Sequence, residues 1–242
     1  MGKEITEINK DTFWQFIEEA KGQCGKDMDA MFSWLNGRLL GMHPEQALKF
    51  HTIIHGYQEA AYKYGLWTAA SLMKEDGYSD DRFVDFRAWL IVQGKAVYMA
   101  ALENPDSLAE VEQYGDCEFE ILTYVGSYAY TELTGRTAYR VCTAEMREQV
   151  LAEISGEIKY HPMIEYPLEI QDVVDVYPKL GNRFVKRYGI QCFLNGSMWN
   201  TSLPGMKELV EKGADEVHKL RMKQEKSKMN KKQPGSQRRS NN

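Results

Sequence analysis

The sequence lacks several features that would assign it to a familiar class of protein. Its four cysteines lie far apart without a Cys-x-x-Cys pair, which argues against a zinc knuckle or a redox dithiol. The first residues carry acids where a secretory signal carries bases, and no apolar segment follows them. The longest apolar run, Ala96 to Leu102, is far shorter than the roughly 20 residues that span a bilayer. We therefore expect a cytoplasmic protein with reduced thiols and no membrane span.

Local signatures of common enzyme classes are also missing. The chain contains no Walker-type phosphate loop, no Gly-x-Ser-x-Gly turn and no Gly-x-Gly-x-x-Gly that follows a strand. These absences lower the expectation of nucleotide-triphosphatase, serine-hydrolase or dinucleotide chemistry, and we expect no cofactor. Whether the protein is an enzyme stays open at this point, as does its oligomeric state.

Charge is unevenly distributed along the chain. The segment from Lys219 to Asn242 carries nine Lys or Arg and one Glu, a net charge of +8, while the preceding 218 residues carry 21 bases and 34 acids, a net charge of -13. The acidic body argues against nucleic-acid binding, because contacts to phosphate need positive charge. The basic tail can attract nucleic acid, an anionic membrane surface or an acidic protein, or it can simply act as a solubilising terminus. It has no aromatic residues on which bases could stack.

The chain does contain a succession of helical patterns. Apolar residues recur at spacings of three and four over most of the first 180 residues, which predicts an all-α, irregular multi-helix bundle. The predicted organisation is a helical domain at 10–182, an irregular connection at 183–203, an amphipathic helix at 204–226 and a disordered basic tail at 227–242.

Two of the predicted helices carry most of the motifs. One begins at Pro44 and should run as a single stripe to Tyr64, with a kink or break at Gly65. The other begins in the segment Gly77 to Gly94, where Ser79 or Asp80 can cap it, and should continue across Gly94 as far as 104. Further helices are predicted at 119–133 and, capped by Thr143, at 144–154.

Four motifs in order carry a resemblance to a known family. They are Trp67-Thr-Ala-Ala, Gly77-Tyr-Ser-Asp-Asp-Arg-Phe, Phe86-Arg-Ala-Trp-Leu-Ile-Val-Gln-Gly and Asn104-Pro-Asp-Ser-Leu. Together with Phe13-Trp14 and, more loosely, Tyr177-Pro-Lys-Leu, they resemble the bacterial family called domain of unknown function 4240 over roughly residues 10 to 182. The resemblance implies a helical domain and carries no biochemical activity with it.

Three acids lie close together at the start of the helix predicted in the Gly77 to Gly94 segment. Asp80, Asp81 and Asp85 can together hold Mg²⁺ or act as an acid and base, and Asp81 and Asp85 are one turn apart on a shared face. The alternative is structural, because acids at a helix start cap it and oppose its dipole. Arg87 lies between two aromatic residues and is expensive to bury unpaired, so we expect Asp81 or Asp106 to pair with it.

Two further groups of residues are candidates for a site. Trp67 and Trp89 belong to an aromatic series that can line a ligand pocket or form core. His51, His55 and Glu59 follow one another at spacings of four, which allows two imidazoles to bind one transition metal. Thr52 stands where a zinc protease helix has its catalytic glutamate, so a packed or solvated face is the alternative.

The leading functional hypothesis is a non-enzymatic interaction or regulatory module of a bacterium. It would use the surface beside Gly77 to Gly94 to bind a protein partner or a small ligand. One alternative is a hydrolase or metal-dependent enzyme that uses Asp80, Asp81 and Asp85. Another is an immunity or defence-associated protein, because an acidic body can mask a basic toxin.

Overall fold

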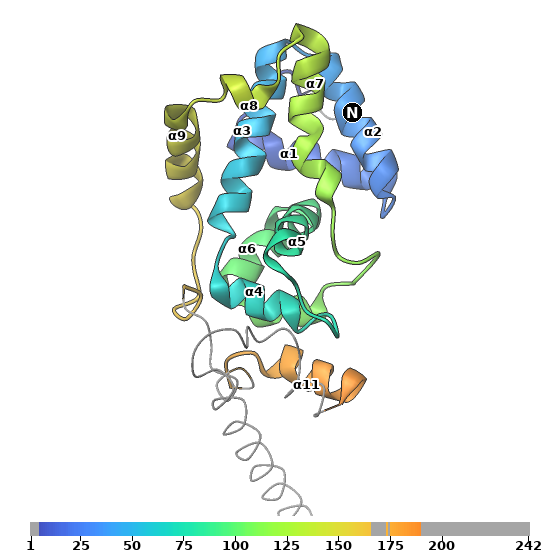
Figure 1. Ribbon diagram of the computed structural model, residues 1–242, viewed down its shortest axis with the longest axis vertical. Helices are drawn as coiled ribbons and strands as arrows, with labels where there is room; N and C mark the ends of the chain where they lie inside the picture. Colours follow the sequence, from blue (N-terminus) through green and yellow to red (C-terminus); the bar gives the residue numbers. More distant parts are fainter. Residues whose placement is uncertain (1–4, 166–172, 174, 190–242) are drawn as a thin grey trace, which may run out of the picture.

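The computed structural model describes residues 5–165, 173 and 175–189, and within these ranges the secondary structure is helical, with no strand (Figure 1). The predicted all-α, multi-helix fold is confirmed. The helix predicted at 204–226 and the tail predicted at 227–242 lie outside the described residues. Within the described part, none of the helices has both the length and the apolar composition that crossing a membrane requires.

The first two helices begin at side chains that accept hydrogen bonds from free backbone N–H groups. Helix α1 (Lys10–Cys24) is capped by Asn9 and α2 (Met28–Leu40) by Asp27. The two helices pack against each other, and α2 ends at Gly41. In Figure 1 both lie in the upper part of the molecule, together with α7 (Val125–Thr134).

Helix α3 (Pro44–Ala60) is the central element, because α7 packs against one side of it and α9 against another (Figure 1). Its apolar stripe is buried as predicted, but the stripe does not reach Tyr64, which is 55% exposed. The chain instead turns after Ala60, and α4 (Tyr64–Ser71) begins as a separate helix. Gly65 allows a close approach here, since a Cβ at this position would lie 2.7 Å from the hydroxyl oxygen of Tyr177.

The Gly77 to Gly94 segment contains one helix, α5 (Asp80–Val92), capped by Ser79 as predicted. The predicted continuation across Gly94 is wrong. Gly94 has a φ of +96°, which only glycine adopts readily, and the chain turns there before α6 (Lys95–Glu103) begins.

The remaining elements are shorter and less regular, and α9 is capped by Thr143 as predicted. The helix predicted at 119–133 is divided into a 3₁₀ segment and an α-helix. Residues 183–188, which were expected to be irregular, belong to α11. The elements are η1 (Pro105–Glu110), η2 (Glu120–Tyr124), α7 (Val125–Thr134), α8 (Ala138–Val141), α9 (Ala144–Ser155) and α11 (Pro178–Tyr188).

Aromatic side chains fill much of the core that these helices enclose. The largest fully buried side chains include Trp89, Tyr57, Tyr98 and Tyr177. The indole Nε1 of Trp14 donates to the hydroxyl of Tyr57 at 2.7 Å, whereas Nε1 of Trp89 and the hydroxyl of Tyr177 are buried without a partner among the described residues. Burial of these rings supplies a large share of the free energy of folding.

Candidate functional site

The three acids of α5 differ in their exposure. Asp80 is exposed and accepts a hydrogen bond of 2.8 Å from the hydroxyl of Tyr62, and Asp81 is exposed on the next position. Asp85 is half-buried, and burial raises its pKa to about 6, with the carboxylate of Glu120 as the next largest cause. Across the described ranges, no group of three or more His, Cys, Asp or Glu side chains is placed to hold a metal ion.

Arg87 is satisfied by carbonyl oxygens and aromatic rings. Its Nε donates to the carbonyl of Phe83 at 3.2 Å, and an Nη donates to the carbonyl of Gln58 at 2.6 Å. The guanidinium also lies 4.6 Å from the ring centre of Tyr62, a cation–π distance. These contacts explain how the charged side chain of Arg87 on α5 can be buried.

The expected pairing of Arg87 with Asp81 or Asp106 is therefore wrong. Arg87 forms no ion pair with a residue in the described part of the chain. Asp81 is six positions earlier on the same helix, a rotation of about 240°, so it points elsewhere. Asp106 caps another helix, α11. Its carboxylate accepts hydrogen bonds from the backbone N–H groups of Lys179 and Leu180 at 3.0 and 2.8 Å.

The two tryptophans of the family motifs pack into the protein. Trp67 is half-buried, donates its indole N–H to the carbonyl of Tyr78 at 2.7 Å, and stacks on Phe83 with ring centres 5.1 Å apart. Trp89 is fully buried. Neither tryptophan lines the pocket next to His51 and His55, which is described below.

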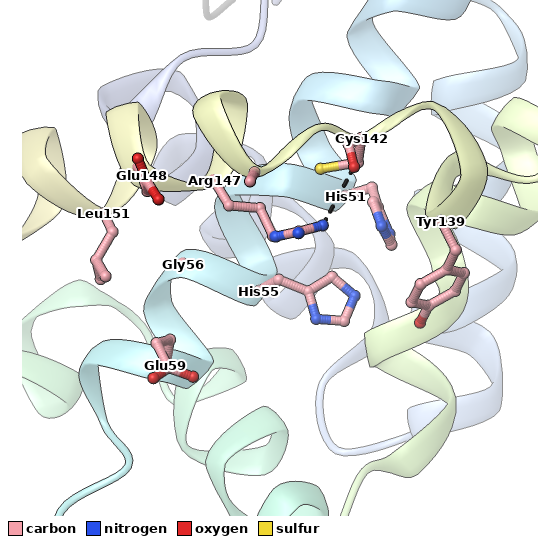
Figure 2. Close-up of a pocket in the computed structure, with 10 residues that line it drawn as sticks. His51, His55, Gly56, Glu59, Tyr139, Cys142, Arg147, Glu148 and Leu151 are labelled. Carbon is pink, nitrogen blue, oxygen red and sulfur yellow. Dashed lines mark hydrogen bonds between the residues drawn. The ribbon is translucent and has the colours of Figure 1, made fainter.

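That pocket lies between α3, α8 and α9 and has a volume of about 380 Å³ (Figure 2). His51, His55 and Glu59, which were predicted from their spacing on one helix, come together along its α3 side. We call it the histidine pocket. Its lining residues are His51, His55, Gly56, Glu59, Tyr139, Cys142, Ala144, Arg147, Glu148 and Leu151.

Each of the two imidazoles has a buried nitrogen without the hydrogen bond that buried polar groups usually have, although His55 as a whole is only half-buried. His51 is 2% exposed, and its ring centre is 4.4 Å from that of His55 and 4.6 Å from that of Tyr139. Nδ1 of His51 and Nε2 of His55 are both buried and find no hydrogen-bond partner among the described residues. Such atoms in a native structure call for an explanation, and a ligand is one.

Both histidines are neutral at pH 7. Burial lowers the pKa of His51 to about 3, and the neighbouring His55 and Arg147 add to this effect. Burial and the charge of Arg147 lower the pKa of His55 to about 4. A neutral imidazole offers one N–H donor and one acceptor nitrogen, so the pair can bind polar groups of either kind.

The opposite wall comes from α9 and the turn before it. Arg147 is in the first turns of α9, and one Nη donates to the carbonyl of Cys142 at 3.1 Å, as the dashed line in Figure 2 marks. The thiol of Cys142 lies 3.5 Å from the hydroxyl of Thr52 on α3. In Figure 2 the guanidinium and the imidazole of His55 face the same space.

A glycine allows α9 to lie so close to α3. A Cβ at Gly56 would lie 2.9 Å from Cγ1 of Val150 and 2.9 Å from Cδ1 of Ile154, both on α9. These distances are too short for carbon atoms in contact, so a larger residue would push α9 away. Gly56 therefore allows α3 and α9 to lie close together next to the pocket.

Sequence reasoning found one wall of the pocket and missed the other. Helix α9 itself and its cap were predicted, but Tyr139, Cys142, Arg147, Glu148 and Leu151 were not recognised as site residues. They are about 90 positions away from the histidines, and no local motif links them. The signal in the sequence was limited to the spacing of the histidines on one apolar helix.

The pattern of motifs around α4, α5 and η1 identifies the family. Residues 8–132, a little over half of the chain, match the family described as "Protein of unknown function (DUF4240)". The chain belongs to this family. No curated protein and no solved structure matches the chain. The family match covers α1 to most of α7 and therefore includes His51, His55 and Glu59, but not the α8 and α9 wall of the pocket.

Proposed function

We propose that this bacterial, cytoplasmic protein is a non-enzymatic binding module that holds a small ligand in the histidine pocket. The observation that carries the proposal is the pair of buried imidazole nitrogens without partners. An unsatisfied buried polar atom costs about 1–3 kcal/mol, and a ligand that bonds to it recovers part of that free energy. The pocket thus replaces the surface beside Gly77 to Gly94 as the preferred site.

The protonation of the histidines supports binding over catalysis. A general acid or base works best when its pKa is close to the pH of the reaction. The pKa values of about 3 for His51 and about 4 for His55 are far below neutrality. The alternative, a metal-dependent hydrolase, would use Asp80, Asp81 and Asp85. It is less favoured because Asp80 is exposed and already accepts a hydrogen bond from the hydroxyl of Tyr62, and Asp81 is exposed as well.

A protein partner is a second candidate, favoured by exposed tyrosines next to the pocket. Tyr124, Tyr128 and Tyr139 are 37%, 54% and 49% exposed. The ring centre of Tyr124 lies 6.3 Å from that of Tyr128 and 6.5 Å from that of Tyr139. Tyrosine is enriched in protein interfaces because it combines a large apolar ring with a hydroxyl. An immunity or defence-associated role would need such a surface and stays a prediction.

Ligand-observed NMR with a library of small polar fragments, both neutral and charged, tests the proposed binding. The full chain and three variants, His55→Ala, Tyr139→Ala and His43→Ala, would be screened under the same conditions. His43 is the matched control, since it is a largely exposed histidine at the start of α3 that does not line the pocket. Tyr139 is half exposed, so its replacement should leave the fold intact.

We expect fragments that bind the wild-type chain and His43→Ala, and that lose their signal in His55→Ala and Tyr139→Ala. Circular dichroism would establish that each variant is folded. Two results would refute the proposal. One is a library without any binder, and the other is a set of binders that all persist in both pocket variants.

A further inference from the structure

The histidine pocket contains charged groups of both signs that do not pair with each other. Arg147, Glu59 and Glu148 all line it. Of the ion pairs between described residues, none includes any of the three. Opposite charges that share a pocket and remain apart can each hold a complementary group of a ligand.

Arg147 provides the anion-binding part of the pocket. Guanidinium has five N–H donors in a planar fork, and among the described residues the guanidinium of Arg147 donates from one Nη to the carbonyl of Cys142. The remaining donors suit the two oxygens of a carboxylate, which guanidinium binds in a bidentate manner. The bond to Cys142 holds the side chain in place, which lowers the entropy lost when a ligand binds.

Two carboxylates provide a cation-binding part. Glu59 is one turn beyond His55 on α3, and Glu148 follows Arg147 on α9, so the two acids approach the pocket from opposite walls. Ionised carboxylates only accept hydrogen bonds, and an ammonium group is a matching donor. Together the three charged groups give the pocket a net charge of -1, which opposes a ligand with two negative charges.

The rest of the pocket lining is neutral. His51 and His55 add hydrogen-bonding groups without charge, and Leu151 and Ala144 add apolar surface. A volume of about 380 Å³ is at the lower end of the range of ligand pockets, roughly 300–1,000 Å³. The pocket therefore fits a small molecule with one short apolar group.

From this arrangement we infer that the pocket binds a small zwitterion of the amino-acid type, with its carboxylate on Arg147 and its ammonium group between Glu59 and Glu148. This inference rests on the proposed function and names the class of ligand. A simple anion would leave both acids without a counter-charge, and a simple cation would be placed beside Arg147. A zwitterion satisfies the charges on both walls.

Isothermal titration calorimetry of the full chain with each of the common L-amino acids tests the inference. For every amino acid that binds, its amide and its N-acetyl derivative would be titrated as well, because each retains only one of the two charges. Inorganic phosphate serves as the probe for an anion alone. The variants Arg147→Gln and Glu59→Gln remove one charge each, and Glu145→Gln is the matched control, an exposed acid of α9 that does not line the pocket.

We expect at least one amino acid to bind. Both of its derivatives should bind at least about tenfold more weakly, because each loses a charged hydrogen bond. Arg147→Gln and Glu59→Gln should weaken binding to a similar degree, while Glu145→Gln should not. Binding of phosphate or of a singly charged derivative as tightly as the amino acid would overturn the inference, as would no binding of any amino acid. If neutral fragments still bind the pocket in that case, the proposed function stands and only the zwitterion is excluded.

Discussion

Lowering the pH from 7 to 5 should destabilise the folded chain through two neighbouring histidines, the buried His51 and the half-buried His55. In the unfolded chain both imidazoles have a pKa near 6.5. In the folded chain the pKa values are about 3 and about 4. The unfolded state therefore binds more protons than the folded state below pH 6.5, and the free energy of unfolding falls as the pH falls through this window. Above pH 6.5 the contribution is constant.

The size of the effect follows from the two sets of pKa values. At pH 5 each histidine is almost fully protonated in the unfolded chain and almost fully neutral in the folded chain, which corresponds to about 2 kcal/mol per histidine, or about 4 kcal/mol for the pair. Asp85 acts with the opposite sign. Its pKa is raised to about 6 in the folded chain, so protonation of Asp85 stabilises the fold below that pH and offsets part of the loss.

Urea denaturation at the two pH values measures this directly. The double variant His51→Gln/His55→Gln removes the titrating groups, and His43→Gln is the control, since His43 is largely exposed. The wild-type chain and the control should lose about 4 kcal/mol more than the double variant on acidification. An equal pH dependence in all three proteins would refute the assignment of two neutral histidines.

Two further predictions concern parts of the fold away from the pocket. Trp89→Ala should lower the free energy of unfolding by about 3–5 kcal/mol because the ring is fully buried, and a loss below about 1 kcal/mol in urea denaturation would contradict that placement. Asp106→Ala should cost about 1 kcal/mol through loss of the cap of α11. Hydrogen exchange of the α11 amides should then accelerate while α3 stays protected, and unchanged exchange in α11 would show that the cap contributes nothing.

The helices and many of their starts could be predicted because their signals are local. Asp27, Ser79 and Thr143 each cap the helix that immediately follows, and a cap depends on an N–H group two or three residues away. The apolar stripe of α3 could be recognised for the same reason, since helical periodicity is visible within a short window. The family motifs likewise lie within a single stretch of the chain.

The features that could not be predicted depend on residues far apart in the sequence. Arg87 meets the carbonyl of Gln58, a backbone acceptor that no pattern of side chains reveals. Asp106 is used by α11, more than 70 residues later. The turn at Gly94 interrupts an apolar pattern that would otherwise continue as one helix. Glycine adopts a positive φ readily, but the sequence does not show whether a given glycine does so.

The position of the histidine pocket across the boundary of the family match has a consequence for related proteins. The imidazoles and Glu59 lie within residues 8–132, whereas Arg147 and Glu148 come from beyond residue 132. A family member that keeps α3 but has a different chain after α7 would retain His51, His55 and Glu59 and exchange Arg147 and Glu148. The same helical domain could in this way acquire different ligands through the segment that follows it, with Gly56 as the point where that segment must fit.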